Sequence, residues 1–458
     1  MPWRCWPSIS KPFPKTKQKE RPHVTEIITP QSTSRPYEKT TLPNGVRIVT
    51  SRMDGVRSAS LIMAYNVGSR IEPAPIAGVA HFLEHMLFKG TENRPDPLTI
   101  SQEIESVGGI VNAGTGRENT SYWAKVPGTH LPLAFDVLAD MLRNSTFDAD
   151  EMEKERKVIF EEIRAMQDIP EDIVHDIIDQ VVWDDDPVGR DVAGTEETVA
   201  NIDREAMLEF FYRNYGADRL VIAAGGDIDH DEIVRLTEKY FGDLPVTINP
   251  HGSTRAVSKQ TEKRIRIITK DTEQAHLTIG FPALSYHDDR RYAQSTIEAI
   301  LSSGMSSRLF QEIREKRGLV YSVYGYFRSH EDVGQGVIYA GTDTERVKET
   351  IAAIMGELKK LRDIPVSAEE LERTKTLRKG RLLMGLEDSR SVASWVGSQE
   401  ATYGTIETPE ELMTHIDSVT AEDVQSLAND LIQEDLMSLV LVGPYTRESD
   451  YLPLLTLD

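Results

Sequence analysis

The decisive stretch of the sequence is HFLEH, at residues 81–85, and apolar or glycine residues without proline flank it on both sides. Such a run favours a buried helix. Positions three and four apart on a helix share one face. We therefore expect His81, Glu84 and His85 to point in the same direction, while the phenylalanine and leucine between them turn toward the core.

The three polar side chains of this stretch suit a metal centre that activates water. Two imidazoles one helical turn apart can both bind a tetrahedral zinc ion. A carboxylate beside them is placed to take a proton from a water molecule that the metal activates. The order H-x-x-E-H is the inverse of the commoner H-E-x-x-H zinc motif. The alternative is a helix whose histidines are ordinary hydrogen-bonded residues, and a third ligand would decide between the two.

A second predicted helix supplies candidates for that third ligand. Asp148 is suited to cap its first turn, and Glu151 follows three residues later, as in a capping box. Glu155 and Glu162 fall inside the apolar stripe of this helix, whereas Glu161 is turned roughly 100° away from it. A carboxylate on the core side is costly unless it is paired or bound to metal. Glu162 is thus a candidate third ligand and Glu155 a candidate partner of a ligand histidine. Spacing alone also allows two solvated carboxylates.

Composition narrows the class of protein. With 458 residues, 39% hydrophobic and 28% charged, the sequence is typical of a globular protein of several domains. The formal net charge of −22 argues against nucleic acid as a partner and is compatible with cationic partners or substrates. No apolar run reaches the length of about 18 residues that a membrane span needs. A single cysteine, Cys5, excludes an internal disulfide framework and a cysteine-ligated metal site.

Residues 1–37 differ from the rest of the sequence because they are rich in proline, lysine, serine and threonine. The apolar stretch of about 7–15 residues that marks a secretory signal is missing. The prolines work against the amphipathic helix of a mitochondrial presequence. We therefore expect a disordered basic arm and, by default, a cytoplasmic location.

The remaining sequence is predicted to form two similar halves, 38–244 and 263–458, joined by a linker at 245–262 that is rich in proline, threonine, serine and glycine. Strand and helix signals of the first half recur in the same order in the second half. A long internal duplication explains this recurrence best. The second half has no H-x-x-E-H motif, so only the first half keeps metal-binding residues.

The elements of the first half can be assigned from turn signals and apolar periodicity. The expected strands are the two around an Asn-Gly turn at 41–49, then 58–65, a hairpin of 111–115 and 120–126, and 219–224. The expected helices are 78–88, 100–107, 131–143, 148–166, 201–215 and 231–241.

These residues resemble those of the pitrilysin/insulysin family of zinc metallopeptidases. The similarity is greatest to its short-chain branch, which contains the mitochondrial processing peptidase subunits and their bacterial relatives. The family's metal motif stands here at residues 81–85, and its E-x6-E pattern stands at Glu155 and Glu162, with Glu162 at the third-ligand position. Its second-half pattern, an arginine followed seven residues later by a tyrosine, stands at Arg314 and Tyr321. The resemblance covers the sequence from about residue 38 to its end.

The resemblance implies an α+β fold of two homologous halves, each a mixed β-sheet backed by helices. It also implies a zinc endopeptidase that works inside a chamber between two chains, as a homodimer or as a heterodimer with a related chain. His81, His85 and Glu162 would hold Zn²⁺, and Glu84 would act as the general base. The acidic net charge suggests that the unfolded peptides it cleaves are basic.

The second half would complete the site of the partner chain. Tyr321 would donate a hydrogen bond to the oxyanion, and Arg314 would hold the substrate backbone or a carboxylate. The peptide is expected to bind as an added strand along Asn112, Ala113 and Thr115. The alternative function is a non-catalytic or partner-dependent subunit of a processing-peptidase-like heterodimer. Such subunits usually lose part of the metal motif, which is complete here.

Overall fold

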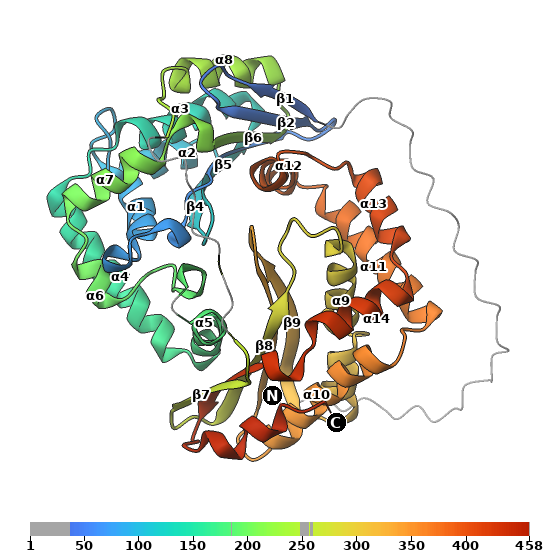
Figure 1. Ribbon diagram of the computed structural model, residues 1–458. Helices are drawn as coiled ribbons and strands as arrows, with labels where there is room; N and C mark the ends of the chain where they lie inside the picture. The colour runs from blue at the N-terminus through green and yellow to red at the C-terminus, as the bar shows by residue number, and fades with distance from the viewer. Residues whose placement is uncertain (1–36, 185, 248–255, 257–259, 458) are drawn as a thin grey trace, which may run out of the picture. The chain divides into compact units, whose positions relative to one another are not determined.

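The computed structural model describes residues 37–184, 186–247, 256 and 260–457. The arm predicted for residues 1–37 lies almost wholly outside these ranges, as does most of the linker predicted for residues 245–262. The described residues form two mixed β-sheets with helices packed against them, as Figure 1 shows. This arrangement confirms the α+β fold expected from the sequence.

The first sheet has six strands in the order β1-β2-β6-β3-β5-β4. Their bounds are β1 Glu38–Thr41, β2 Arg47–Arg52, β3 Ser58–Tyr65, β4 Ile110–Thr115, β5 Thr120–Pro127 and β6 Leu220–Gly226. Strand β2 runs parallel to β6, and the other neighbours are antiparallel. The predicted hairpin is present as β4 and β5, which leaves β4 as an edge strand.

The second sheet has five strands in the order β7-β11-β8-β10-β9. Their bounds are β7 Arg264–Thr269, β8 Gln274–Ala283, β9 Val320–Ser329, β10 Gly334–Asp343 and β11 Ser438–Gly443. Only the pair β7–β11 is parallel. When β1 is left out, the strands of the first sheet have the same topological order as those of the second, and the parallel pair β2–β6 corresponds to β7–β11. The internal repeat predicted from the sequence therefore extends to the strand topology.

The helices have the following bounds. In the first half they are α1 Val79–Leu87, α2 Pro97–Glu105, α3 Leu131–Asn144, α4 Ala149–Asp168, α5 Pro170–Trp183, α6 Glu196–Ala200, α7 Arg204–Asn214 and α8 His230–Phe241. In the second half they are α9 Arg291–Ser302, a π-helical segment Phe310–Lys316, α10 Val347–Asp363, α11 Ala368–Gly385, α12 Ser389–Tyr403, α13 Pro409–Ser418 and α14 Ala421–Leu431. Helix α7 begins later than the sequence pattern indicated, because the Asp203 side chain caps it by accepting a hydrogen bond from Ala206 N.

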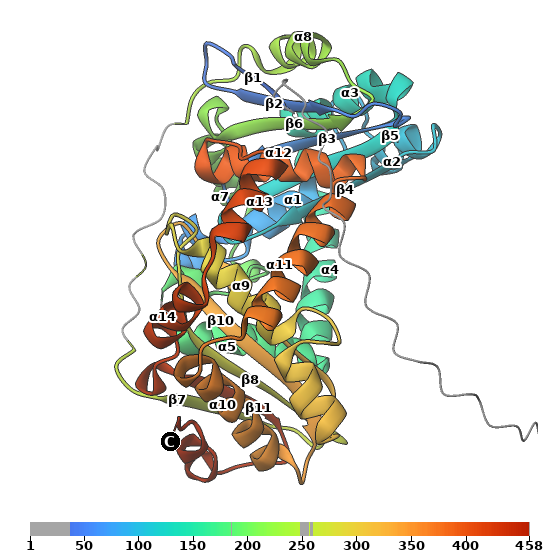
Figure 2. The same cartoon turned by 90° about the vertical axis from the view of Figure 1, so that its right-hand side faces the viewer.

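Two helices are exchanged between the halves. Helix α12 follows α11 and packs on the first sheet, whereas α5 follows α4 and packs on the second, as Figures 1 and 2 show. Small residues permit the close approach of α12, since a Cβ atom at Gly225 would lie 2.7 Å from Ser389 O. The hydroxyls of Ser58 and Ser60 each lie 2.9 Å from that of Ser389. The halves are therefore interlocked, which the repeat pattern alone did not predict.

The exchange buries both faces of each sheet. Along β3, Leu61 and Met63 pack into the main core of the first half, whereas the alternate residues Ile62 and Ala64 pack toward α12. The strands of the second sheet alternate in the same way, with one face turned toward α5. None of the described helices combines the length and hydropathy that a membrane-spanning segment needs.

Candidate metal centre

Helix α1 presents the HFLEH stretch as the sequence predicted. Its apolar side chains, Phe82 and Leu83 among them, are buried in the core of the first half. The opposite face carries His81, Glu84 and His85, which remain partly exposed. Amphipathic packing of a nine-residue helix thus turns the three polar side chains toward one side.

The two histidines meet a carboxylate from α4. The Nε2 atoms of His81 and His85 are 3.1 Å apart, and Oε2 of Glu162 lies 4.0 Å from the first and 3.6 Å from the second. Two ligands held at about 2.0–2.1 Å by a tetrahedral ion lie roughly 3.4 Å apart, so the three separations fit a zinc ion. Among the described residues, this is the only group of three histidine, cysteine or acidic side chains with ligand atoms within 4.8 Å of one another.

The neighbouring Glu161 points elsewhere. It is 74% exposed along its side chain and forms an ion pair of 2.8 Å with Arg164. The structure therefore brings Glu162, and not Glu161, to the histidines, in agreement with the direction of the apolar stripe on α4.

The two imidazoles have different electrostatic environments. Burial, followed by the neighbouring His85, lowers the pKa of His81 to about 4. Burial acts to lower the pKa of His85 as well, but its hydrogen bond to Glu155 and the nearby carboxylates outweigh burial and raise the pKa. A neutral imidazole is the form that binds metal, and His81 already has that form in this environment.

Glu155 orients His85. Its Oε1 atom lies 2.8 Å from Nδ1 of His85, and its Oε2 atom lies 2.6 Å from Nζ of Lys89. The Glu155 side chain is only 8% exposed, and burial alone would raise its pKa, but the bonds to His85 and Lys89 lower it. A carboxylate there fixes the tautomer with its proton on Nδ1 and leaves Nε2 free for a metal. No sequence motif singled out Lys89, although it follows His85 by one helical turn.

Thr115 of β4 holds Glu84. Its hydroxyl donates a hydrogen bond to Oε2 of Glu84, which ties the edge strand to the motif helix. Burial raises the pKa of Glu84, and the bonds to Thr115 oppose this rise. This contact of the Thr115 side chain with Glu84 is distinct from the substrate contact predicted for Thr115 from the sequence.

The edge of β4 is accessible beside the histidines. Asn112 is exposed, and its Oδ1 atom accepts a hydrogen bond of 2.7 Å from the backbone N–H of Ala113. A cleft of about 340 Å³ lies between this strand and α1, and its lining includes Glu84, His85 and Asn112.

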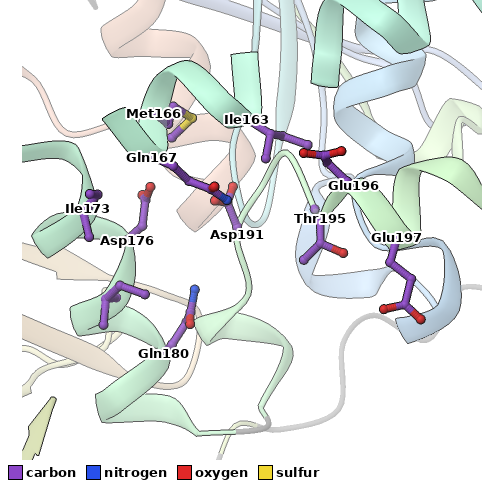
Figure 3. Close-up of a pocket in the computed structure, with 12 residues that line it drawn as sticks. Ile163, Met166, Gln167, Ile173, Asp176, Gln180, Asp191, Thr195, Glu196 and Glu197 are labelled. Atoms are coloured by element: carbon purple, nitrogen blue, oxygen red, sulfur yellow. The ribbon is translucent and has the colours of Figure 1, made fainter. Parts of the chain in front are cut away.

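A second cleft, of about 430 Å³, adjoins the C-terminal end of α4 (Figure 3). Four of its lining residues are acidic and none is basic; the acidic ones are Asp176, Asp191, Glu196 and Glu197. Burial, with the neighbouring Asp191 and Asp179, raises the pKa of Asp176 to about 7. Ile163, which follows Glu162 on α4, also lines this cleft. No local motif marks this group, because its members are scattered over 22 positions of a segment rich in acidic residues.

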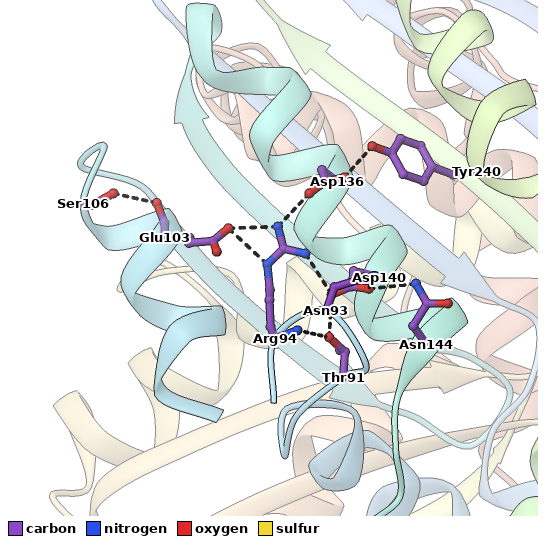
Figure 4. Close-up of polar contacts among 9 residues, drawn as sticks. All are labelled: Thr91, Asn93, Arg94, Glu103, Ser106, Asp136, Asp140, Asn144 and Tyr240. Atoms are coloured by element: carbon purple, nitrogen blue, oxygen red, sulfur yellow. Dashed lines mark hydrogen bonds and ion pairs between the residues drawn. The ribbon is translucent and has the colours of Figure 1, made fainter. Parts of the chain in front are cut away.

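Arg94 anchors the loop that follows α1. Its guanidinium contacts Glu103 at 2.9 Å, Asp136 at 2.6 Å and Asp140 at 2.8 Å, as Figure 4 shows. These acids belong to α2 and α3. The network therefore ties the loop after the motif helix to two neighbouring helices.

Arg314 and Tyr321 lie in the second half, apart from this cluster. The Arg314 guanidinium stacks 5.0 Å from the Tyr321 ring, and the tyrosine is 78% exposed. Within the described chain, neither side chain forms a hydrogen bond or ion pair with His81, His85 or Glu162. The structure does not bring the two residues to the metal cluster of their own chain.

A duplicated α+β fold with an inverted zinc motif in its first half defines a class, the M16 peptidases. Residues 47–196 match the model of that family, described as insulinase (peptidase family M16), and residues 201–378 match the model described as peptidase M16 inactive domain. The chain belongs to the insulinase family, peptidase family M16. Zinc is the metal of this family, and two imidazoles with one carboxylate suit it.

Curated relatives and solved structures agree with this assignment. The chain is 38% identical to an uncharacterized zinc protease of Streptomyces coelicolor, over 89% of each chain. It is 39% identical to the uncharacterized zinc protease YmxG of Bacillus subtilis, over 88% of this chain and 97% of that one. The fold matches the crystal structure of a protease from Helicobacter pylori with a TM-score of 0.82 and 22% identity, covering 89% of this chain and 99% of that one.

Proposed function

We propose that this protein is a zinc-dependent endopeptidase in which His81, His85 and Glu162 hold the ion and Glu84 is the general base. The observation that carries the proposal is the convergence of two imidazoles and one carboxylate within 4.8 Å of one another. Family membership supports it, because relatives that match almost the whole chain are named zinc proteases.

Different residues of this chain have different roles in the proposed hydrolysis of a peptide bond. A zinc ion supplies Lewis acidity, which lowers the pKa of water and polarises a carbonyl. Glu84 accepts the proton from the attacking water and delivers it to the leaving amine. Thr115 holds the Glu84 carboxylate through its hydroxyl, and Glu155 holds His85 with Nε2 toward the ion. Each reacting group is thus oriented before substrate arrives, which lowers the reorganisation needed in the transition state.

The substrate is an extended peptide that binds along β4. The strand is an edge of its sheet and lies beside Glu84, so a peptide added to it would place its backbone next to the catalytic carboxylate. An incoming strand would take over the N–H of Ala113 that Asn112 now satisfies. Recognition through the backbone reads little sequence, which suits unfolded peptides.

A preference for basic peptides follows from the acidic cleft. Asp176 and Asp191 line it, and Ile163 of the same cleft is next to Glu162 on α4. A lysine or arginine side chain of a peptide bound at β4 would gain from these carboxylates.

Arg314 and Tyr321 are proposed to act in a partner chain. Tyr321 is 78% exposed, which suits a side chain that contacts a second protein molecule. A dimeric chamber, in which each second half faces the other chain's histidines, would bring the pair to a metal site. The second candidate function follows from the same exposure: a partner-dependent subunit that is silent on its own.

The test is cleavage of an internally quenched, arginine-containing peptide by the zinc-loaded protein. Glu84→Gln should abolish cleavage and leave zinc binding intact, since Glu84 is not part of the ligand group. Glu161→Gln, which removes a carboxylate from the exposed face of α4, is the matched control and should cleave as the parent does. Cleavage by Glu84→Gln at the parent rate would end the peptidase proposal.

An experiment that mixes two inactive variants distinguishes a homodimer with shared sites from a partner-dependent subunit. Glu84→Gln chains and Tyr321→Phe chains should each be inactive, and their mixture should regain part of the activity if sites are shared between chains. Mixtures without recovery contradict shared sites. A parent protein that binds zinc, remains monomeric and is inactive alone supports the partner-dependent subunit.

A further inference from the structure

The motif helix begins without a cap of its own. Its N-cap residue is Gly78, which adopts the left-handed conformation with φ of 96°. A Cβ atom at this position would lie 2.5 Å from the carbonyl oxygen of Ala193, so no residue with a side chain fits there. The first N–H groups of α1 therefore need an acceptor from another part of the chain.

Glu72 is that acceptor. Its Oε2 atom accepts a hydrogen bond of 2.7 Å from Gly78 N, and its Oε1 atom accepts one of 2.7 Å from Ala80 N. The residue is only 5% exposed, and its own carbonyl oxygen accepts a bond of 3.1 Å from Nη1 of Arg190. Burial raises the pKa of Glu72 to about 8. The two N–H groups oppose this rise, and they and the positive end of the helix dipole favour the ionised carboxylate.

The two histidines depend on this helix to different degrees. Glu155 holds Nδ1 of His85. Nδ1 of His81 is buried and has no hydrogen-bond partner within the described part of the chain. Without a bond at Nδ1 like that of His85, the placement of the His81 ring depends more on the backbone of α1. Ala80, one residue before His81, is bonded to Glu72.

We infer that Glu72 is a positioning residue of the metal centre, which sets the placement of His81 by fixing the first turn of α1. The inference rests on the metal site proposed above. Glu72 touches neither metal nor substrate, and its effect should appear first in the affinity for zinc rather than in the chemical step.

Zinc affinity of the metal-free protein, measured by competition with a chromophoric chelator, tests this role. Glu72→Gln keeps the shape of the side chain but turns an amide donor toward a backbone donor. It should raise the zinc Kd roughly 10-fold, the size expected when a group that orients a metal ligand is lost. Glu72→Asp keeps the charge and should give a smaller rise.

A matched control separates positioning from general stability. Asp229 caps α8, where its Oδ1 atom accepts a hydrogen bond of 2.9 Å from Glu232 N, and α8 carries no member of the metal cluster. Asp229→Ala removes a helix cap, as Glu72→Gln does, and should lower the melting temperature without changing the zinc Kd.

The possible results distinguish a positioning role of Glu72 from a general effect on stability. A zinc Kd that rises in Glu72→Gln and stays constant in Asp229→Ala supports the inference. A folded Glu72→Gln protein with the parent Kd overturns it, and so does an equal rise in the control. If Glu72→Gln does not fold, Glu72→Asp decides by the same criterion. A parent protein that binds no zinc overturns the proposed function and this inference together, whereas loss of the effect in a zinc-binding parent overturns this inference alone.

Discussion

Adjacent carboxylates on α4 offer a direct test of how this chain holds zinc. Glu162 faces the two histidines, and Glu161 faces Arg164 at the surface. Glu162→Gln and Glu161→Gln change the net charge equally, on the same helix, one position apart. Any difference between the two variants therefore reports the direction of the side chain and not its charge alone.

The magnitude follows from the number of ligands. Zinc sites with four protein ligands bind with about 10–16 kcal/mol, or roughly 3 kcal/mol for each ligand. Every 1.4 kcal/mol corresponds to about tenfold in Kd, so losing the anionic ligand should weaken binding by about 100-fold or more. Glu161 contributes only a solvent-exposed ion pair, which adds little stability and nothing to metal binding.

The assay is chelator competition on the metal-free proteins, with circular dichroism to show that both variants fold. We expect the zinc Kd of Glu162→Gln to rise by about 100-fold or more and that of Glu161→Gln to match the parent. Equal weakening in both variants, or a parent-like Kd in Glu162→Gln, would refute the assignment of the third ligand.

Three further predictions follow from named contacts. Glu155→Gln removes the carboxylate that holds His85 and should raise the zinc Kd by roughly 10-fold in the same chelator assay; a parent-like Kd would contradict its orienting role. Burial and two neighbouring acids raise the pKa of Asp176 to about 7, so its carboxylate ionises as the pH rises from 6 to 8. The KM for arginine-containing peptides should fall over that interval, and Asp176→Asn should flatten the profile; an unchanged profile would remove Asp176 from substrate binding. Arg94→Met leaves the buried Asp140 carboxylate without its cation and should lower the free energy of unfolding by about 3 kcal/mol in denaturant titrations. Adding Asp140→Asn to this variant removes the unpaired charge and should restore part of the lost stability.

The sequence carried enough information for the parts of the site that depend on local geometry. The helical period placed His81, Glu84 and His85 on one face, and the apolar stripe of α4 separated Glu162 from Glu161. Recurring strand and helix signals indicated the duplication that the two sheets display. The sequence predicts these features because every helix or strand signal involved is local, a pattern of residues a few positions apart.

Local sequence patterns did not predict the features that join distant segments of the chain. Helices α5 and α12 cross between the halves, and nothing in their own periodicity says which sheet they cover. Nothing in the sequence distinguishes Glu72 from the other acidic residues. Its place at the start of α1 becomes apparent only from its hydrogen bonds to Gly78 N and Ala80 N, at a helix start where Gly78 adopts the left-handed conformation and closely approaches Ala193. The acidic cleft likewise forms only when α4, α5 and the segment after them fold together.

In the proposed metal centre, one zinc ion lies between two imidazoles of α1 and one carboxylate of α4. Anomalous diffraction at the zinc absorption edge, from crystals of the zinc-loaded protein, measures this directly. We expect one strong peak per chain within bonding distance of Nε2 of His81, Nε2 of His85 and a carboxylate oxygen of Glu162. A peak elsewhere, or a zinc-loaded crystal with no peak at these atoms, would contradict it.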